Sequence, residues 1–156
     1  MADAAFPAEL PVGIRDGYGL EHVQPFARTD MATGRARQRR TFTSVPSMVT
    51  VTWIMTAPEA RLFEAWFRYT IKDGTDWFTA PLKSPLDSGN EVSSYRCRFT
   101  EMYSGPSLEG VCHWRFRANL EIFERPTLVP GWEQFPEYVL NADILDLAIN
   151  REWPEA

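Results

Sequence analysis

The side chains best suited to chemistry in this 156-residue chain are two cysteines and two histidines: Cys97, Cys112, His22 and His113. A zinc site would have to combine all four, and their spacing fits no familiar zinc pattern. A catalytic triad needs a histidine that moves protons, but His113 is expected in mid-strand beside Arg115, and His22 lies in a proline-bounded segment. We therefore predict no metal, no cofactor and no catalytic residue, and we expect both cysteines to be small buried side chains.

The composition narrows the classes of partner. Carboxylates are scattered, so no pair is singled out for acid–base work, and no glycine-rich phosphate loop is present. The formal net charge of -5 argues against nucleic acid as the main partner, because that partner requires a dominant basic face. No apolar run approaches the roughly 20 residues that span a bilayer, and the two cysteines suit a reducing compartment. We predict a non-enzymatic protein that has no membrane partner.

Charge is concentrated at two places in the chain. Residues 29–40, which we expect to be a long loop, contain a basic run of four residues: Arg35, Arg37, Arg39 and Arg40. Residues 28 to 40 hold five arginines against Asp30, a local charge of +4. Residues 130–156 hold six acidic residues against Arg151, a local charge of -5. The two segments are therefore electrostatically complementary.

Two readings of these segments stay open. The basic run is either a solvated loop or a docking surface for the acidic end of a neighbouring copy, and both segments could instead grip other subunits. Three aromatic residues of the acidic segment are either interface anchors or packed on one another: Trp132, Tyr138 and Trp153. We favour an interface, because an extension this long cannot reach deeply into a core that is already filled.

A helix is predicted over residues 57–72. Thr56 and Glu59 form a capping box at its start, and Pro58 suits the first turn, where its missing N–H costs nothing. Gly74 supplies a left-handed stop after the last turn. The side chains expected on the apolar face follow the i, i+3, i+4, i+7, i+8 spacing: Phe63, Trp66, Phe67, Thr70 and Ile71.

The longest strand is predicted within residues 41–55, where apolar and polar residues alternate. The side chains expected to face one way are Val49, Val51, Trp53 and Met55. Because Pro46 cannot donate a ladder hydrogen bond, we expect this strand to bulge or to sit at an edge of its sheet.

Further extended segments follow the helix and precede the long strand. Residues 76–82 are expected to be a short strand, and residues 95–103 and 111–123 an antiparallel hairpin joined by the loop 104–110. Near the start, Asp16-Gly17 indicates a turn between two extended segments.

These elements define the expected fold class, mainly β with one α-helix. Five or six antiparallel strands and the helix, all within residues 1–126, suit an antiparallel β-sandwich or split barrel whose open side the helix plugs. Residues 127–156 are expected to be a C-terminal arm with a short helix that begins at Asn141. Its shared face would comprise Leu140, Ile144, Leu147 and Ala148.

The order of these motifs resembles a known family. The stretch from Leu10 to Arg125 contains Asp16-Gly17-Tyr18, the helix from Glu59 to Trp66, Trp77-Phe78 and Leu120-Glu121. In this order it resembles the minor tail proteins of long-tailed bacteriophages, the family related to the lambda tail-tip protein M, and it is similar to the distal tail proteins of phages and gene transfer agents. The Arg-rich segment 28–40 and everything after Pro126 depart from that pattern.

The resemblance implies a fold of the tail-tube type and a place in the virion, at the tip of the tail, after assembly in the host cytoplasm. Such proteins form a ring, commonly hexameric, and their partners are further copies, the tail tube protein and the baseplate hub or tail-fibre proteins. DNA would pass through the lumen without specific binding. A tail-terminator or head–tail connector protein is one alternative, and a carbohydrate-binding β-sandwich module is a more distant one.

Overall fold

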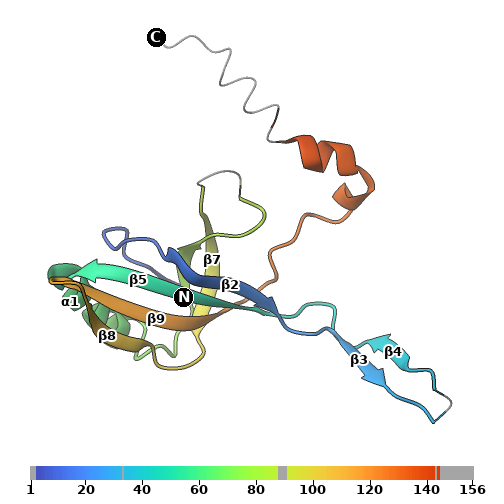
Figure 1. Ribbon diagram of the computed structural model, residues 1–156, viewed down its shortest axis with the longest axis horizontal. Coiled ribbons are helices and arrows are strands. Elements are labelled where there is room, and N and C mark those ends of the chain that lie inside the picture. The colour runs from blue at the N-terminus through green and yellow to red at the C-terminus, as the bar shows by residue number, and fades with distance from the viewer. Residues whose placement is uncertain (1–2, 33, 88–90, 143, 145–156) are drawn as a thin grey trace, which may run out of the picture.

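The computed structural model describes residues 3–32, 34–87, 91–142 and 144, and most of its regular structure is β (Figure 1). Seven strands form one sheet in the order β1-β6-β7-β9-β5-β2, with β8 paired to β9, and β3 and β4 form a separate pair. The bounds are β1 Ala4–Ala5, β2 Ile14–His22, β3 Phe26–Thr29, β4 Arg37–Arg40, β5 Ser47–Thr56, α1 Ala57–Ala65, β6 Phe78–Leu82, β7 Ser93–Phe99, β8 Ser104–Glu109 and β9 His113–Ile122. A π-helical segment, Trp66–Thr70, continues α1, a 3-10 turn spans Trp132–Gln134, and residues 136–142 and 144 are helical.

The centre of the sheet is the long antiparallel pair of β5 and β9, in register from Ser47 opposite Ile122 to Thr56 opposite His113. The alternation predicted for β5 is confirmed, and the matching face of β9 is buried as well. The buried side chains of this pair are Ser47, Val49, Val51, Trp53, Met55, Phe116, Ala118, Leu120 and Ile122, joined by Thr52 from the opposite face.

The helix begins as the sequence predicts. The Glu59 carboxylate accepts hydrogen bonds from the backbone N–H of Thr56 at 2.7 Å and from its hydroxyl at 2.8 Å. These two bonds, the backbone one first, lower the pKa of Glu59. The capping box thus fixes the corner at which β5 turns directly into α1.

The helix ends two residues earlier than predicted. The α-helix stops at Ala65, and the wider π-helical segment stops at Thr70, so Thr70 is exposed and not part of the apolar face. Three residues then have positive φ angles, 50° at Lys72, 58° at Asp73 and 85° at Gly74. A Cβ added to Gly74 would lie 3.1 Å from the Phe67 ring, so this stop needs glycine both for its φ and for space.

The helical segment lies against one face of the sheet (Figure 1), and its aromatic side chains pack on that face. The ring centroids of Phe63 and Phe116 are 4.9 Å apart, and those of Trp66 and Phe78 are 5.1 Å apart. Each of these four side chains is less than a tenth exposed. Ring pairs at such distances contribute about 0.5–1.5 kcal/mol beyond the apolar area they bury, so these contacts help to hold α1 and the π-helical segment on the sheet.

The expected turn at Asp16-Gly17 is wrong. Both residues lie inside β2, where the pairing with β5 shifts register between Ile14 and Gly19. Gly17 has a φ of 69°. A β-bulge and a hairpin turn both favour glycine at a left-handed position, so the same dipeptide signal fits either structure.

Three further strand expectations need correction. β5 is flanked by β9 and β2 and is not an edge strand, and Pro46 lies just before its first residue, so no ladder bond is lost. The expected loop 104–110 is largely the strand β8. The sheet is also mixed and not wholly antiparallel, because β1 pairs with β6 in parallel.

The two cysteines differ. Cys97 is buried as predicted, and burial raises the pKa of its thiol to about 12. Cys112 is exposed near the tip of the β8–β9 hairpin, so the prediction that it is buried is wrong. The helix of the C-terminal segment begins at 136 and not at Asn141, because Pro136 suits a first helical position; Leu147 and Ala148 lie outside the described residues.

Candidate interface

The predicted loop of residues 29–40 is instead part of a two-stranded antiparallel ribbon. β3 and β4 pair from Phe26 opposite Arg40 to Thr29 opposite Arg37. We call residues 26–42 the ribbon. It runs out from the sheet at the lower right of Figure 1 and pairs with no strand of the main sheet.

The ribbon divides the four predicted arginines into two groups. Arg37 and Arg39 lie two strand positions apart, so they share one face of the ribbon. Within the described part of the chain, Arg35, Arg37 and Arg39 are exposed and form neither an ion pair nor a side-chain hydrogen bond. Arg40 instead donates to the carbonyl oxygens of Phe42 at 3.0 Å and of Thr43 at 2.7 Å. Three arginines are therefore available to a partner, and the fourth fixes the base of the ribbon.

The ribbon also exposes apolar surface. Phe26 is 38% exposed, Met31 50% and Phe42 57%. Among the described residues of the ribbon, Arg28 and Asp30 form an ion pair at 3.6 Å. It is largely exposed, and such pairs contribute little to stability. Phe26 is paired with Arg40, next to Arg39 in the strand, so it lies on the ribbon face opposite to Arg37 and Arg39. The ribbon thus presents the two arginines on one face and the Phe26 ring on the other.

The C-terminal segment leaves the sheet after β9 and runs away from it, toward the upper right of Figure 1. We call residues 124–156 the arm. Trp132 is 51% exposed and Tyr138 71%; Trp153 lies outside the described residues. The other exposed large apolar side chains of the described arm are Leu128, Val129, Phe135, Leu140 and Ile144. The described arm therefore carries a row of apolar side chains that its own chain leaves in contact with solvent.

The root of the arm is held by a cluster that the sequence reasoning did not find. The Phe123 and Trp77 ring centroids are 5.3 Å apart. The Arg96 guanidinium lies 5.0 Å from the Phe123 ring and 5.1 Å from the Trp77 ring, and Arg98 lies 4.6 Å from Trp77. Such contacts stabilise by about 0.5–1 kcal/mol each at exposed sites. The sequence did show Arg96 and Arg98 at alternate, outward-facing positions of one strand. It did not show their partners, because Trp77 and Phe123 come from other segments.

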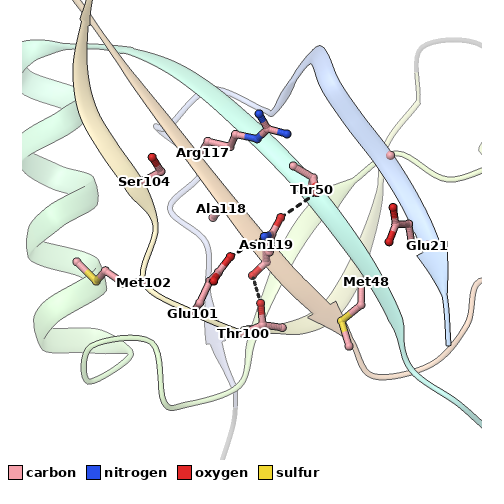
Figure 2. A pocket seen from close by; sticks show the side chains of 11 residues that line it. Glu21, Met48, Thr50, Thr100, Glu101, Met102, Ser104, Arg117, Ala118 and Asn119 are labelled. Carbon is pink, nitrogen blue, oxygen red and sulfur yellow. Dashed lines mark hydrogen bonds between the residues drawn. The ribbon is translucent and has the colours of Figure 1, made fainter.

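A polar groove of about 630 Å³ lies on the sheet face opposite α1 (Figure 2). The Thr50 hydroxyl donates to Asn119 Oδ1 at 2.8 Å, and Asn119 Nδ2 donates to Glu101 Oε1 at 2.6 Å. The Thr100 hydroxyl donates to the Asn119 carbonyl at 3.0 Å. These groups bond one another across β5, β9 and the β7–β8 connection, and the lining holds no cysteine or histidine. The groove could accommodate a polar surface of another molecule. Among its lining residues, no nucleophile is hydrogen-bonded to a base.

A second charged group joins the bulge of β2 to the β8–β9 hairpin. Arg115 donates to both Glu109 oxygens, at 2.9 and 3.0 Å, and to Asp16 Oδ2 at 2.6 Å. These hydrogen bonds, with that of Glu109 first, raise the pKa of Arg115. Asp16 of the expected turn thus serves as an ion-pair partner between two strands.

The four residues considered first for chemistry do not come together. His22 Nδ1 lies 2.8 Å from the Ser47 hydroxyl, and His113 Nδ1 lies 3.5 Å from Cys112 Sγ. Among the described residues, no group of three or more His, Cys, Asp or Glu side chains is arranged to hold a metal ion. No helix in the described ranges is long and apolar enough to cross a membrane.

Comparison of the chain with protein-family models, with curated proteins and with solved structures gives no match. Function is therefore inferred from the geometry of the chain, whose most distinctive features are the ribbon and the arm.

Proposed function

We propose that this chain is a structural protein of a bacteriophage tail tip. Its copies form a ring, hexameric by analogy with the proteins it resembles, between the tail tube and the baseplate hub or tail fibres. The observation that carries the proposal is that one β core bears two projections, the ribbon and the arm, which expose apolar side chains to solvent. Three ribbon arginines, Arg35, Arg37 and Arg39, also have no partner within the described chain. A subunit completed by its neighbours in a closed ring has this character.

The proposal takes the sheet to be a split barrel of the tail-tube type. In support, the Tyr18 hydroxyl donates to the Lys83 carbonyl at 2.6 Å and so joins β2, at one end of the strand order, to the segment after β6, near the other end. Burial raises the pKa of Tyr18 to about 12, as expected of a phenol enclosed at such a join.

The mechanism is the geometry of an adaptor, without catalysis or cofactor. One face of the ring matches the tail tube and the other matches the hub or fibres, while DNA passes through the lumen without specific binding. The net charge of -5 is consistent with a lumen that does not retain DNA. The protein is assembled in the host cytoplasm and resides in the virion tail.

A carbohydrate-binding module is less well supported. That function requires exposed tryptophans aligned on one sheet face or at loop tips. Trp53 and Trp66 are buried in the core, Trp77 and Trp114 are half-buried, and Trp132 is on the arm. The described tryptophans therefore form no common platform.

The test is to locate the protein on virions that encode it. Gold-labelled antibody against the chain is expected to mark the distal end of the tail. Deletion of the gene is expected to give particles that lack complete tail tips and are not infectious. Label at the head–tail joint, with finished but unattached tails in the deletion, would replace the proposal with a terminator or connector function. Virions without label would exclude a virion protein.

A further inference from the structure

We infer that the arm of one copy binds the ribbon of a second copy, so that each subunit gives one arm and receives another. This deepens the proposed function, and it rests on that function for the premise that copies assemble. The partner is therefore a second copy of this chain, and the binding surface is the ribbon face that carries the unpaired arginines.

Charge complementarity is the first argument. The ribbon segment 28–40 carries +4, and the segment 130–156 of the arm carries -5. Arg35, Arg37 and Arg39 have no acidic partner in the described chain, and the described arm places Glu133 and Glu137 in exposed positions. Complementary potentials of this kind guide association and fix its register.

Apolar complementarity is the second argument. Charge alone would suit a weak, wet contact, but both projections also expose rings and aliphatic side chains. Met31 and Phe42 lie beside the ribbon strands, Phe26 lies on the ribbon face opposite to Arg37 and Arg39, and Trp132 and Tyr138 lie on the arm. Interfaces place aromatic and arginine side chains at their centre, and the two projections together supply both kinds.

The arrangement of the two projections favours exchange between copies. Their roots share one cleft of about 390 Å³, lined by Arg40 and Val45 on the ribbon side and by Glu124 and Arg125 on the arm side. From this cleft the ribbon and the arm diverge (Figure 1). The backbone N–H groups of Thr41 and Phe42 donate to the Pro25 carbonyl at 2.8 and 3.0 Å and close the base of the ribbon, and the Trp77–Phe123 cluster holds the root of the arm. Because the ribbon and the described part of the arm diverge beyond this cleft, they make no further contact with each other within one chain. Each is therefore free to bind a neighbouring copy.

Such a contact is heterologous, because the two surfaces differ. Repeated from copy to copy, it closes into a ring if the rotation between neighbours allows and otherwise gives an open filament. Arm exchange would thus explain how one interface builds the proposed ring.

The test uses charge reversal in the full-length purified chain. The variant Arg37→Glu/Arg39→Glu reverses the ribbon, and Glu133→Arg/Glu137→Arg reverses the arm. Light scattering over a dilution series measures self-association. Each reversed variant is expected to weaken association at least about tenfold, because like charges then face each other. The chain that carries all four changes is expected to regain association, since its signs match again.

A matched control separates this contact from general charge effects. Arg61→Glu/Arg68→Glu makes the same change in charge on exposed positions of the helical segment, and its association is expected to stay within about twofold of the wild type. Circular dichroism and thermal unfolding confirm that each variant is folded. Wild-type behaviour of the ribbon-reversed variant, a monomeric wild type at every concentration, or failure of the fourfold variant to recover would each overturn the inference.

Cross-linking decides between exchange and contact within one chain. In a Cys112→Ser background, Arg37→Cys chains are mixed with Tyr138→Cys chains and oxidised. The mixture is expected to form heterodimers well above the homodimers of either chain alone. Equal cross-linking in the separate chains, or an internal cross-link alone when both cysteines are on one chain, would overturn exchange. The antibody label on the tail tests the proposed function independently, so arm exchange can fail while that label stands.

Discussion

The core of this molecule and its two projections use the same kinds of side chain in opposite ways. In the core, Phe63, Trp66 and Phe116 are enclosed by one another, and among the described residues no buried side-chain nitrogen or oxygen lacks a hydrogen-bond partner. In the ribbon and the arm, rings and guanidinium groups are exposed. The core encloses its apolar side chains within one chain, whereas the described projections leave theirs exposed to solvent.

This difference in exposure suggests that different residues determine the stability of the fold and the association of copies. A side chain that the core encloses should affect the free energy of unfolding, and a chemically similar side chain on a projection should affect only association. A residue of the core can therefore be compared with a chemically similar residue of a projection. Unfolding is measured on dilute protein, so that association does not contribute to the result.

The largest expected difference concerns two phenylalanines. Phe63→Ala removes a fully buried ring that contacts Trp53, Trp66 and Phe116 and is expected to lower the free energy of unfolding by about 3–5 kcal/mol. Phe135→Ala, on the arm, is expected to change it by less than about 0.5 kcal/mol. Urea unfolding followed by tryptophan fluorescence measures both. Equal losses would show that the arm is part of the cooperative core and would remove the comparison.

Two glycines with left-handed backbone give the next difference. Gly74→Ala combines an unfavourable φ of 85° with close contacts to Phe67 and Phe99, and a loss of about 1–3 kcal/mol is expected. Gly34, near the ribbon tip, has a φ of 80°, but nothing lies within 4 Å of an added Cβ. Gly34→Ala should therefore leave global unfolding almost unchanged, because the ribbon can open separately. A full-size loss at Gly34 would show that the ribbon unfolds together with the sheet.

The distinction between buried core and exposed projections also explains which elements could be predicted from the sequence. The capping box of Thr56 and Glu59 and the alternation of Val49, Val51 and Trp53 are local patterns that also agree with burial, so they are found in the structure as predicted. The ribbon has no such pattern. Both of its faces meet solvent, and strands without a buried face show no apolar alternation.

Other failures have their own physical causes. β8 contains Gly105 and Pro106, which indicate a turn by their types although the segment pairs with β9. The cluster of Trp77, Arg96 and Phe123 joins three separate segments, so no single window of sequence contains it. The basic and acidic segments of the candidate interface were visible as charge runs, but which arginines remain unpaired depended on the strand register.

Two tyrosines give a smaller difference. Tyr18→Phe removes the hydroxyl that donates to the Lys83 carbonyl and is expected to cost about 1 kcal/mol, whereas Tyr138→Phe on the arm is expected to cost nothing measurable. The pKa of Tyr18 is raised from 10.0 to about 12, so the fold favours the neutral phenol. Its contribution is therefore complete below pH 10 and is lost as the pH rises toward 12. Stability curves of Tyr18→Phe that keep the full alkaline loss would contradict this assignment.

The smallest difference concerns two carboxylates that each accept a hydrogen bond from a nearby backbone N–H. Glu59 accepts from Thr56 at 2.7 Å, and Glu133 accepts from Gly131 at 2.6 Å. Glu59→Ala is expected to cost about 0.5–1 kcal/mol, because α1 loses its cap while packed on the core. Glu133→Ala is expected to leave unfolding unchanged, because the arm lies outside that core.

Acid titration tests the contribution of the Glu59 carboxylate to stability. The fold lowers the pKa of Glu59 through its bonds to Thr56, so this group stabilises the protein above the carboxyl's unfolded pKa and loses its contribution as the pH falls through the folded pKa. Glu59→Ala should therefore flatten the acid limb of the stability curve slightly. The measurement is unfolding free energy against pH for the wild type and for Glu59→Ala. Parallel acid limbs in the two would mean that the capping box does not stabilise the sheet through this carboxylate, and the assignment of Glu59 to the core side of the comparison would then be wrong.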